Sequence, residues 1–318
     1  MSAGIAKNSR IELVFAYWGV GAEAGMNEVW IDEVVRRTGG RLSFKKVTRG
    51  TPTLPVKADV FNDCPAAGGK YHLLDLIQTP FIFTNSAVGS RVVAQLYAEF
   101  KELRDELGEV KIVGIGTGAL MGLFASRSWG PISSLESFKG ARTRSLGPID
   151  KALEALGARP EHPHFLEIGD LLEKGKLDAA VFGLGLGEAR GWAAQAPYCT
   201  LAGELSISMH PMRIYMTWEA WNGLPPDIQK VIDSLGPSGA DGWYAAQNGI
   251  VFDKTIPTAR EYIRKNGEFI TLAPEELSRW VEALQPVREA AIEAVEKKGK
   301  PGREFFKRML ELIKKFNA

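Results

Sequence analysis

Residues 11–47 read IELVFAYWGVGAEAGMNEVWIDEVVRRTGGRLSFKKV and predict a strand, a helix and a second strand in succession. Residues 11–18 form a compact apolar run, which is typical of a buried strand. Residues 22–37 place apolar side chains at three- and four-residue spacing, and a pair of glycines then ends the predicted helix. Residues 42–47 alternate apolar and polar side chains for most of their length, as a half-buried strand does.

The alternation of strands and helices continues along the chain and predicts a layered α/β fold. The further strands expected are 56–61, 110–116, 139–144, 178–182 and 205–217, and the helices are 90–107, 147–156, 165–174, 226–235, 239–263, 273–298 and 302–316. Residues 73–83 are expected to be a helix end that runs into an irregular crossing, and the glycine-rich 183–187 a tight turn. A chain of 318 residues fits two lobes, and the return strand at 205–217 predicts crossings that can act as a hinge.

Composition argues against several classes of protein. The 39 Lys and Arg residues are balanced by 38 Asp and Glu, so no basic field is present to hold nucleic acid or an anionic bilayer. Cys64 and Cys199 are too few for a disulfide scaffold, and the 4 histidines lack a flanking carboxylate array, so no metal site is expected. No apolar run approaches the roughly 18 residues of a membrane-spanning helix. Residues 1–10 show no secretory signal, so either an export signal was removed or the protein stays inside the cell.

No nucleotide-binding or catalytic motif is complete. The cluster 114–118 (GIGTG) follows a predicted strand, but Ala119 occupies the sixth position of G-x-G-x-x-G, and no helix with a correctly spaced acid follows cleanly. Turn glycines are therefore the better interpretation. No G-x-S-x-G motif is present, and Cys64 has no recognisable partner motif. We therefore expect no cofactor and no enzymatic activity.

Two arginines and a tryptophan are candidate ligand-binding residues. Arg142 and Arg144 lie two positions apart in a predicted strand, so their side chains are expected to point the same way. An arginine at a strand end beside a cleft can bind a carboxylate through two parallel hydrogen bonds. On the residues alone, the alternative of two surface arginines is preferred. Trp18 ends the first strand, a position that is typical either of a ligand pocket or of a core.

A series of short motifs in a fixed order resembles one protein family, the DctP-type solute-binding proteins of tripartite ATP-independent periplasmic (TRAP) transporters. The matching segments are VVRRTGGRL at 34–42, QTPFIF at 78–83, PI at 131–132, FKGARTR at 138–144, LGARP at 156–160, GKLD at 175–178 and WNGLPPDIQ at 221–229. The resemblance spans roughly residues 11 to 290. Each motif is loose, but their order is specific.

The resemblance implies a two-lobed periplasmic-binding-protein-like α/β fold with hinge strands and a long lobe-spanning helix. Lobe I is expected to contain 9–121 plus 208–250, and lobe II 122–207 plus 251–318 with the C-terminal helices. It further implies a periplasmic monomer that captures a small organic carboxylate and delivers it to TRAP membrane permease subunits. Two alternatives stay open: a cytoplasmic carboxylate sensor, and an enzyme that uses the same cleft.

The resemblance also assigns residues to the ligand site. Arg144 stands where the family's arginine holds the ligand carboxylate, and Phe165 where it has a pocket-lining aromatic side chain. Phe182 replaces a polar side chain of sialic-acid-binding members, and Phe124 or a neighbour replaces a second arginine of many sugar-acid binders. With Trp18 these residues predict a monocarboxylate with an apolar or aromatic body. Three further candidates complete the predicted site: Tyr17, Arg142 and His210.

Overall fold

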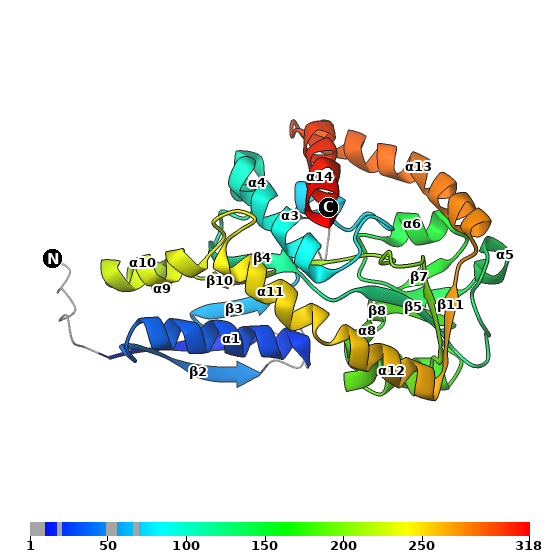
Figure 1. Cartoon of the computed structure of the whole chain (residues 1–318), viewed down its shortest axis with the longest axis horizontal. Coiled ribbons are helices and arrows are strands. Elements are labelled where there is room, and N and C mark those ends of the chain that lie inside the picture. Colours follow the sequence, from blue (N-terminus) through cyan, green and yellow to red (C-terminus); the bar gives the residue numbers. More distant parts are fainter. Residues whose placement is uncertain (1–9, 18–20, 49–55, 66–69) are drawn as a thin grey trace.

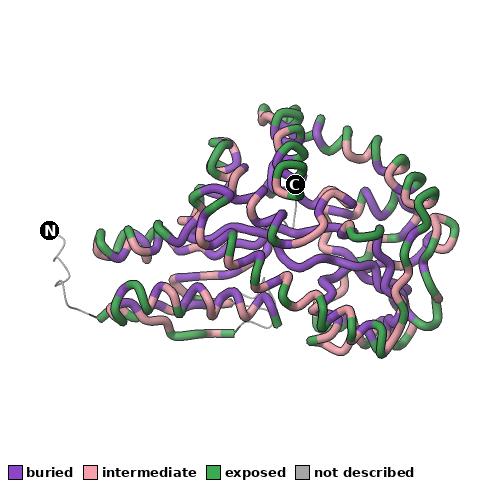
Figure 2. Tube along the Cα trace, viewed as in Figure 1, coloured by how far each residue is buried: buried purple, intermediate pink, exposed green. Residues whose placement is uncertain are grey.

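The computed structural model describes residues 10–17, 21–48, 56–65 and 70–318, and it contains two β-sheets covered by helices (Figure 1). This mixed α/β architecture is the fold class that the sequence predicts. Buried residues follow the strands and the inner sides of the helices, whereas the outer sides of the helices are exposed (Figure 2). Within the described residues, no helix is both long enough and apolar enough to cross a membrane.

The first sheet has five strands in the order β2-β1-β3-β10-β4. Its strands are β1 (Ile11–Tyr17), β2 (Leu42–Thr48), β3 (Val60–Asp63), β4 (Lys111–Thr117) and β10 (Pro211–Met216). β1 pairs in parallel with β2 and β3, and β10 runs antiparallel between β3 and β4. β10 comes about 150 residues after β3 in the sequence, and it pairs with β3 in this sheet. The chain therefore returns to the first lobe after it has formed most of the second.

Helix α1 (Ala22–Arg37) connects β1 to β2, and its apolar residues are buried at the spacing that the sequence predicts. Trp30 of α1 is fully buried and meets the ring of Phe15 on β1 edge to face, with the ring centroids 5.8 Å apart. Met26 and Val34 lie on the same buried side of the helix. Burial of each such side chain stabilises the fold by about 1.5–3 kcal/mol, so the apolar spacing read from the sequence is what holds α1 to its sheet.

The second sheet has six strands in the order β11-β9-β5-β8-β6-β7. Its strands are β5 (Met121–Ala125), β6 (Arg142–Arg144), β7 (Arg159–Glu161), β8 (Ala179–Gly183), β9 (Tyr198–Leu201) and β11 (Glu268–Thr271). β5, β7, β9 and β11 were not expected from the sequence. β5 is a fully buried run of five residues and lacks the alternation that marks a half-buried strand.

The remaining elements are helical. They are α2 (His72–Leu76), α3 (Ser86–Glu99), α4 (Lys101–Glu106), α5 (Leu135–Phe138), α6 (Asp150–Ala155), η1 (Phe165–Glu167), α7 (Ile168–Glu173), α8 (Leu184–Ala189), η2 (Trp192–Ala194), α9 (Trp218–Asn222), α10 (Pro226–Leu235), α11 (Trp243–Asp253), α12 (Ile256–Asn266), α13 (Pro274–Glu296) and α14 (Gly302–Asn317). The helix predicted over 90–107 is wrong in one respect, because Phe100 is extended and separates α3 from α4.

Crossing segments connect the two sheets. Residues 118–120 lead from β4 into β5, and 202–210 lead from β9 into β10. These two crossings lie side by side, since the Gly118 N–H donates to the His210 carbonyl oxygen at 2.9 Å. The strand expected over 205–217 is therefore confirmed only for its second half, Pro211–Met216.

A third crossing is made by two helices where one long helix was expected over 239–263. α11 packs against α3, α1 and β4 on the first lobe, whereas α12 packs against α8 and β11 on the second (Figure 1). The break has a chemical cause: Pro257 has no N–H to donate to the carbonyl oxygen of Asp253, and its ring crowds that group. The lobe-spanning element is thus a pair of helices joined at Lys254 and Thr255.

The glycine-rich stretch 183–187 is not the tight turn that its sequence predicts. Gly183 ends β8, and the other four residues form the first part of α8. None of the three glycines has a positive φ. They allow close packing instead, because a Cβ on Gly187 would lie 3.0 Å from Cε2 of Phe182, and one on Gly183 would lie 2.9 Å from Cβ of Ala119.

The strands of the first sheet lie within 11–117 and 211–216, and those of the second within 121–201 and 268–271; the lobe boundaries implied by the family resemblance stay a prediction. α14 was grouped with the second lobe, but it packs against α3 and α2 as well as α13. Figure 1 shows α13 reaching back from the second lobe toward α14 beside α3. The C-terminal helices therefore contact both lobes.

Candidate ligand-binding site

A cavity of about 410 Å³ lies between the two sheets and receives side chains from both of them. Its described lining residues are Glu23, Asp63, Cys64, Pro65, Lys70, Tyr71, Met121, Arg144, Leu146, Pro163, His164, Phe165, Phe182, Gly183, Leu186, His210 and Arg213. About half of these residues are aromatic or aliphatic, and seven carry acidic, basic or imidazole side chains. This composition is that of a small-molecule site, in which apolar walls hold the body of a ligand and a few polar groups orient it.

Arg144 supplies the cavity with a buried positive charge. It ends β6, which pairs with β7 and β8, so its backbone is held inside the second sheet. Its side chain donates from Nη1 to the Val181 carbonyl oxygen at 3.3 Å, but its buried Nε has no hydrogen-bond partner in the described structure. Burial lowers the pKa of Arg144 to about 10, so the guanidinium stays charged at neutral pH. A buried charge without an ionic partner is costly, and an anion in the cavity would remove that cost.

His210 adds a neutral polar group beside Arg144. The residue is 7% exposed, and neither ring nitrogen has a hydrogen-bond partner among the described residues. Burial, followed by the positive charge of Arg144, lowers the pKa of His210 to about 4. At neutral pH the imidazole therefore carries one hydrogen and one free lone pair.

Stacked rings form the apolar wall. Phe182 of β8 lies parallel to Phe124 of β5, with the ring centroids 4.0 Å apart, and Trp192 meets both Phe182 and Phe165 edge to face. The guanidinium of Arg144 lies 5.9 Å from the centre of the Phe165 ring, and that of Arg190 lies 5.3 Å from it on the same ring. Phe165 therefore borders the cationic end of the cavity, within the range of a cation–π contact.

A second buried arginine is already neutralised. Arg213 of β10 donates from Nε to Oδ1 of Asp63 at 2.8 Å and from Nη2 to Oδ2 at 3.2 Å. Its Nη2 also donates to the hydroxyl of Tyr71 at 3.3 Å. The pair brings no net charge to the cavity, in contrast to Arg144.

Glu23 is a buried acid at the start of α1. Burial raises the pKa of its carboxyl to about 7, although its own backbone N–H and the charge of Arg190 act in the opposite direction. The group is therefore poised near half protonation at neutral pH. It belongs to α1 of the first lobe, whereas Arg144 belongs to β6 of the second sheet, and both line the cavity.

Comparison with known families identifies the class of protein. Residues 39–294 match the family model DctP, described as bacterial extracellular solute-binding protein, family 7. The chain belongs to this family. The resemblance to DctP-type solute-binding proteins of TRAP transporters, inferred from the order of short motifs, is thereby confirmed.

Solved structures share the fold of this DctP-family protein. A TRAP solute-binding protein from Rhodoferax ferrireducens, in complex with copurified benzoate, has a TM-score of 0.87 at 20% identity, with 96% of this chain and 98% of that chain covered. One from Bordetella bronchiseptica, with bound (R)- and (S)-mandelate, has a TM-score of 0.85 at 19% identity, with 96% and 99% covered. A sugar acid binding protein from Advenella mimigardefordensis, in complex with galactonate, has a TM-score of 0.75 at 18% identity, with 96% and 99% covered.

The structure brings four of the predicted site residues of this DctP-family protein together around the cavity: Arg144, Phe165, Phe182 and His210. Trp18 lies outside the described residues. Phe124 is fully buried behind Phe182, and Tyr17 donates its hydroxyl hydrogen to Oε1 of Glu28 at 3.1 Å. Neither of these two is among the described residues that line the cavity.

Arg142 requires a correction, because its guanidinium does not share a site with that of Arg144. Asp178 accepts from Nε of Arg142 at 2.9 Å and from Nη2 at 2.7 Å, and the Gly175 carbonyl oxygen accepts from Nη2 at 2.6 Å. Strand periodicity fixes the direction of the Cβ atom, but a long side chain then follows its ion-pair partner. Arg142 is consequently absent from the described cavity lining.

Sequence reasoning missed Glu23, Asp63, Tyr71 and Arg213 as cavity residues. One signal was available for Arg213, since it is the single charged residue in the otherwise uncharged segment 205–217. A charge in a predicted buried strand needs a partner, and this indicates a buried pair or a site. The partner itself was not predictable, because Asp63 is 150 positions away.

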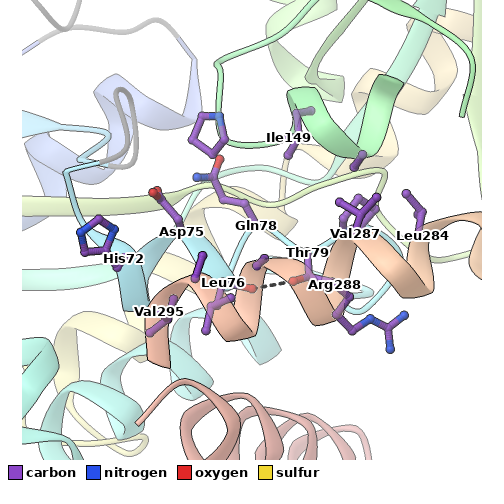
Figure 3. Close-up of a pocket in the computed structure, with 15 residues that line it drawn as sticks. His72, Asp75, Leu76, Gln78, Thr79, Ile149, Leu284, Val287, Arg288 and Val295 are labelled. Atoms are coloured by element: carbon purple, nitrogen blue, oxygen red, sulfur yellow. Dashed lines mark hydrogen bonds between the residues drawn. The ribbon is translucent and has the colours of Figure 1, made fainter. Parts of the chain in front are cut away.

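A second cavity of about 220 Å³ lies between α2, α13 and the start of α6 (Figure 3). Asp75 and Gln78 line it, and both Asp75 Oδ1 and Gln78 Nε2 are buried without a hydrogen-bond partner in the described structure. Burial, and then the charge of Glu106, raise the pKa of Asp75 to about 7. An anionic ligand would be repelled by Asp75 here, so the cavity at Arg144 is the better carboxylate site. Among the described residues, no group of three or more His, Cys, Asp or Glu side chains is placed to hold a metal ion.

Proposed function

We propose that this DctP-family solute-binding protein captures a small organic monocarboxylate with an apolar or aromatic body in the cavity between its two sheets. The carboxylate binds the guanidinium of Arg144, and the body of the ligand contacts Phe165 and Phe182. The loaded protein then delivers its ligand, in the periplasm and as a monomer, to TRAP membrane permease subunits. Release to the permease requires no chemical change in the ligand.

The observation that carries the proposal is the state of Arg144. The residue is 6% exposed and lines the cavity, its guanidinium is charged, and its Nε has no hydrogen-bond partner among the described residues. Arginine presents several N–H groups in a flat fork that matches a carboxylate. A hydrogen bond between charged partners contributes about 1.5–3 kcal/mol, and this site offers room for more than one.

The preference for one carboxylate follows from the charges around the cavity. Among the described residues that line the cavity, Arg213 is already paired with Asp63 and Lys70 with Glu109, so Arg144 is the lining cation left without an ionic partner. A second carboxylate would meet the neutral imidazole of His210 and the acid Glu23, neither of which brings a compensating positive charge. Benzoate, mandelate and galactonate, with which the similar structures were solved, each carry a single carboxylate, and this supports the proposal.

The test is a binding titration of the purified chain with a panel of carboxylic acids, followed by paired substitutions in β6. Arg144→Lys keeps the charge but loses the planar fork, and Arg142→Lys makes the same change two residues away, at an arginine held by Asp178. We expect Arg144→Lys to weaken binding at least 10-fold, because about 1.4 kcal/mol corresponds to a factor of ten. The matched Arg142→Lys variant should bind as the wild type does.

Equal affinity of the Arg144→Lys and wild-type proteins for every acid that binds would refute the role of Arg144. Recovery of a chemically altered acid after incubation would favour the alternative of an enzyme that uses the same cleft. Recovery of unchanged acid, released on unfolding, supports a binding protein.

A further inference from the structure

His210 occupies the crossing segment between β9 and β10 and lines the ligand cavity together with Arg144. It is among the buried polar side chains, and both of its ring nitrogens lack a hydrogen-bond partner among the described residues. Buried polar groups in proteins are almost always satisfied. An imidazole left with two open positions at the wall of a cavity therefore indicates that a bound molecule supplies a partner.

The charge of Arg144 determines what kind of partner fits. The imidazole is neutral at pH 7, because burial and the nearby guanidinium both disfavour its protonation. A positive charge also favours the tautomer whose lone pair faces it, since the lone pair is the negative end of the ring dipole. The nitrogen on the Arg144 side is then an acceptor, and an ionised carboxylate has no hydrogen to offer it.

We propose that the ligand is a 2-hydroxy acid, whose hydroxyl group donates a hydrogen bond to His210 while Arg144 binds its carboxylate. A hydroxyl on the carbon next to the carboxylate stays close to the Arg144 end of the cavity, which His210 also lines. It can also accept from Nε of Arg144, which has no partner in the described structure. This inference rests on the proposed function and specifies the class of acid within it.

Other acids satisfy the site less well. An unsubstituted acid leaves the lone pair of His210 without a donor, and a 2-oxo acid replaces the donor by a second acceptor. An acid whose hydroxyl lies on the far side of an aromatic ring places the donor away from the Arg144 end of the cavity. These three classes are therefore the matched controls for the hydroxyl group.

Calorimetric titration of the full chain with pairs of acids tests the inference. The pairs are mandelate with phenylacetate, lactate with propionate, and 2-hydroxyisocaproate with 4-methylpentanoate, which differ only by the 2-hydroxyl group. Phenylglyoxylate and 3-hydroxyphenylacetate serve as the 2-oxo and remote-hydroxyl controls. One net hydrogen bond predicts that the hydroxy acid of at least one pair binds roughly 3- to 10-fold more tightly than its partner and the controls.

His210→Phe keeps a flat ring and removes both nitrogens. We expect it to bring the affinity ratio of each pair to about one, whatever its effect on the affinity for the unsubstituted acid. A ratio of one or lower in every pair of the wild type overturns the inference, and so does a preference that His210→Phe leaves unchanged.

A measurement on the wild type covers the case in which His210→Phe does not fold. With 15N-labelled histidine, the ring-nitrogen resonances of His210 should shift on addition of the hydroxy acid and not on addition of its unsubstituted partner. The same shift with both acids overturns the inference. Failure of the proposed function is distinguishable, because it is the absence of Arg144-dependent binding for every carboxylate, with or without a hydroxyl group.

Discussion

Asp63→Asn removes the charge that neutralises Arg213 at the cavity wall. The wild-type carboxylate accepts from Nε at 2.8 Å and from Nη2 at 3.2 Å, and the Arg213 side chain is only 5% exposed. Breaking a buried ion pair by removing one partner costs about 3–5 kcal/mol. The Asp63 side chain is 17% exposed, and the hydroxyl of Tyr71 still accepts from Arg213 in the variant. We therefore expect Asp63→Asn to lower the free energy of unfolding by an amount near the lower limit, about 3 kcal/mol.

The same substitution should change ligand selectivity. An unpaired Arg213 gives the cavity a second positive charge, and a second carboxylate on the ligand can then replace the lost partner. A hydrogen bond to a charged group contributes about 1.5–3 kcal/mol, which corresponds to roughly 10- to 100-fold in affinity. Titration of Asp63→Asn with glutarate and pentanoate should therefore show dicarboxylate binding improved by that factor relative to the wild type.

Asp178→Asn is the matched control for Asp63→Asn. Asp178 binds Arg142 through the same two-point geometry, but the pair lies outside the described cavity lining. Its loss should lower the free energy of unfolding, measured by urea denaturation, without altering the preference between glutarate and pentanoate. If Asp63→Asn unfolds at the wild-type urea concentration and gains no affinity for glutarate, Arg213 does not depend on Asp63 and the single-charge account of selectivity is wrong.

Two further predictions concern buried ionisable groups. The folded-state pKa of Glu23, about 7, is higher than its ordinary value of 4.5, so its contribution to stability is present below pH 4.5 and lost as pH rises through 7. Glu23→Gln should thus gain about 3 kcal/mol relative to the wild type between pH 4 and pH 8 in urea denaturation, and a constant difference would contradict this. Cys199 is fully buried, with its thiol pKa raised by burial, whereas Cys64 lines the cavity. Mass spectrometry after alkylation should show Cys64 protected by a bound acid and Cys199 unreactive with or without it, and equal labelling of both thiols would contradict the placement.

Local periodicity predicted most of the first lobe because its elements depend on neighbours in sequence. The apolar spacing of 22–37 gives the bounds of α1, and Pro226 marks the start of α10 where a helix was expected. The second lobe was harder. Its strands β5 and β9 are four or five residues long and wholly or mostly buried, so their side chains alternate between two apolar surroundings and leave no pattern of period two.

The residues of the candidate site also differ in how far the sequence could predict them. Arg144 was found because it stands in a motif of the family, and the structure places it at the cavity wall. Arg142 was assigned to the same site from the direction of its strand alone. Its ion-pair partner Asp178, which holds its guanidinium away from the cavity, lies 36 positions away in the sequence. Sequence spacing predicts where a Cβ atom points, but the place of a guanidinium depends on the acid that tertiary structure brings to it.

The division of the cavity between the two sheets suggests an order of events in binding. Arg144 and Phe182 belong to the second sheet, whereas the neutral pair of Arg213 and Asp63 belongs to the first. His210 lies in a crossing segment that is hydrogen-bonded to the neighbouring crossing, where rotation of the lobes displaces atoms least. We therefore expect the carboxylate to bind the second lobe first, with His210 already in place. Closure then covers the ligand with a first-lobe wall whose buried arginine is already paired with Asp63, so it adds contacts that favour the closed form without adding a second unpaired arginine.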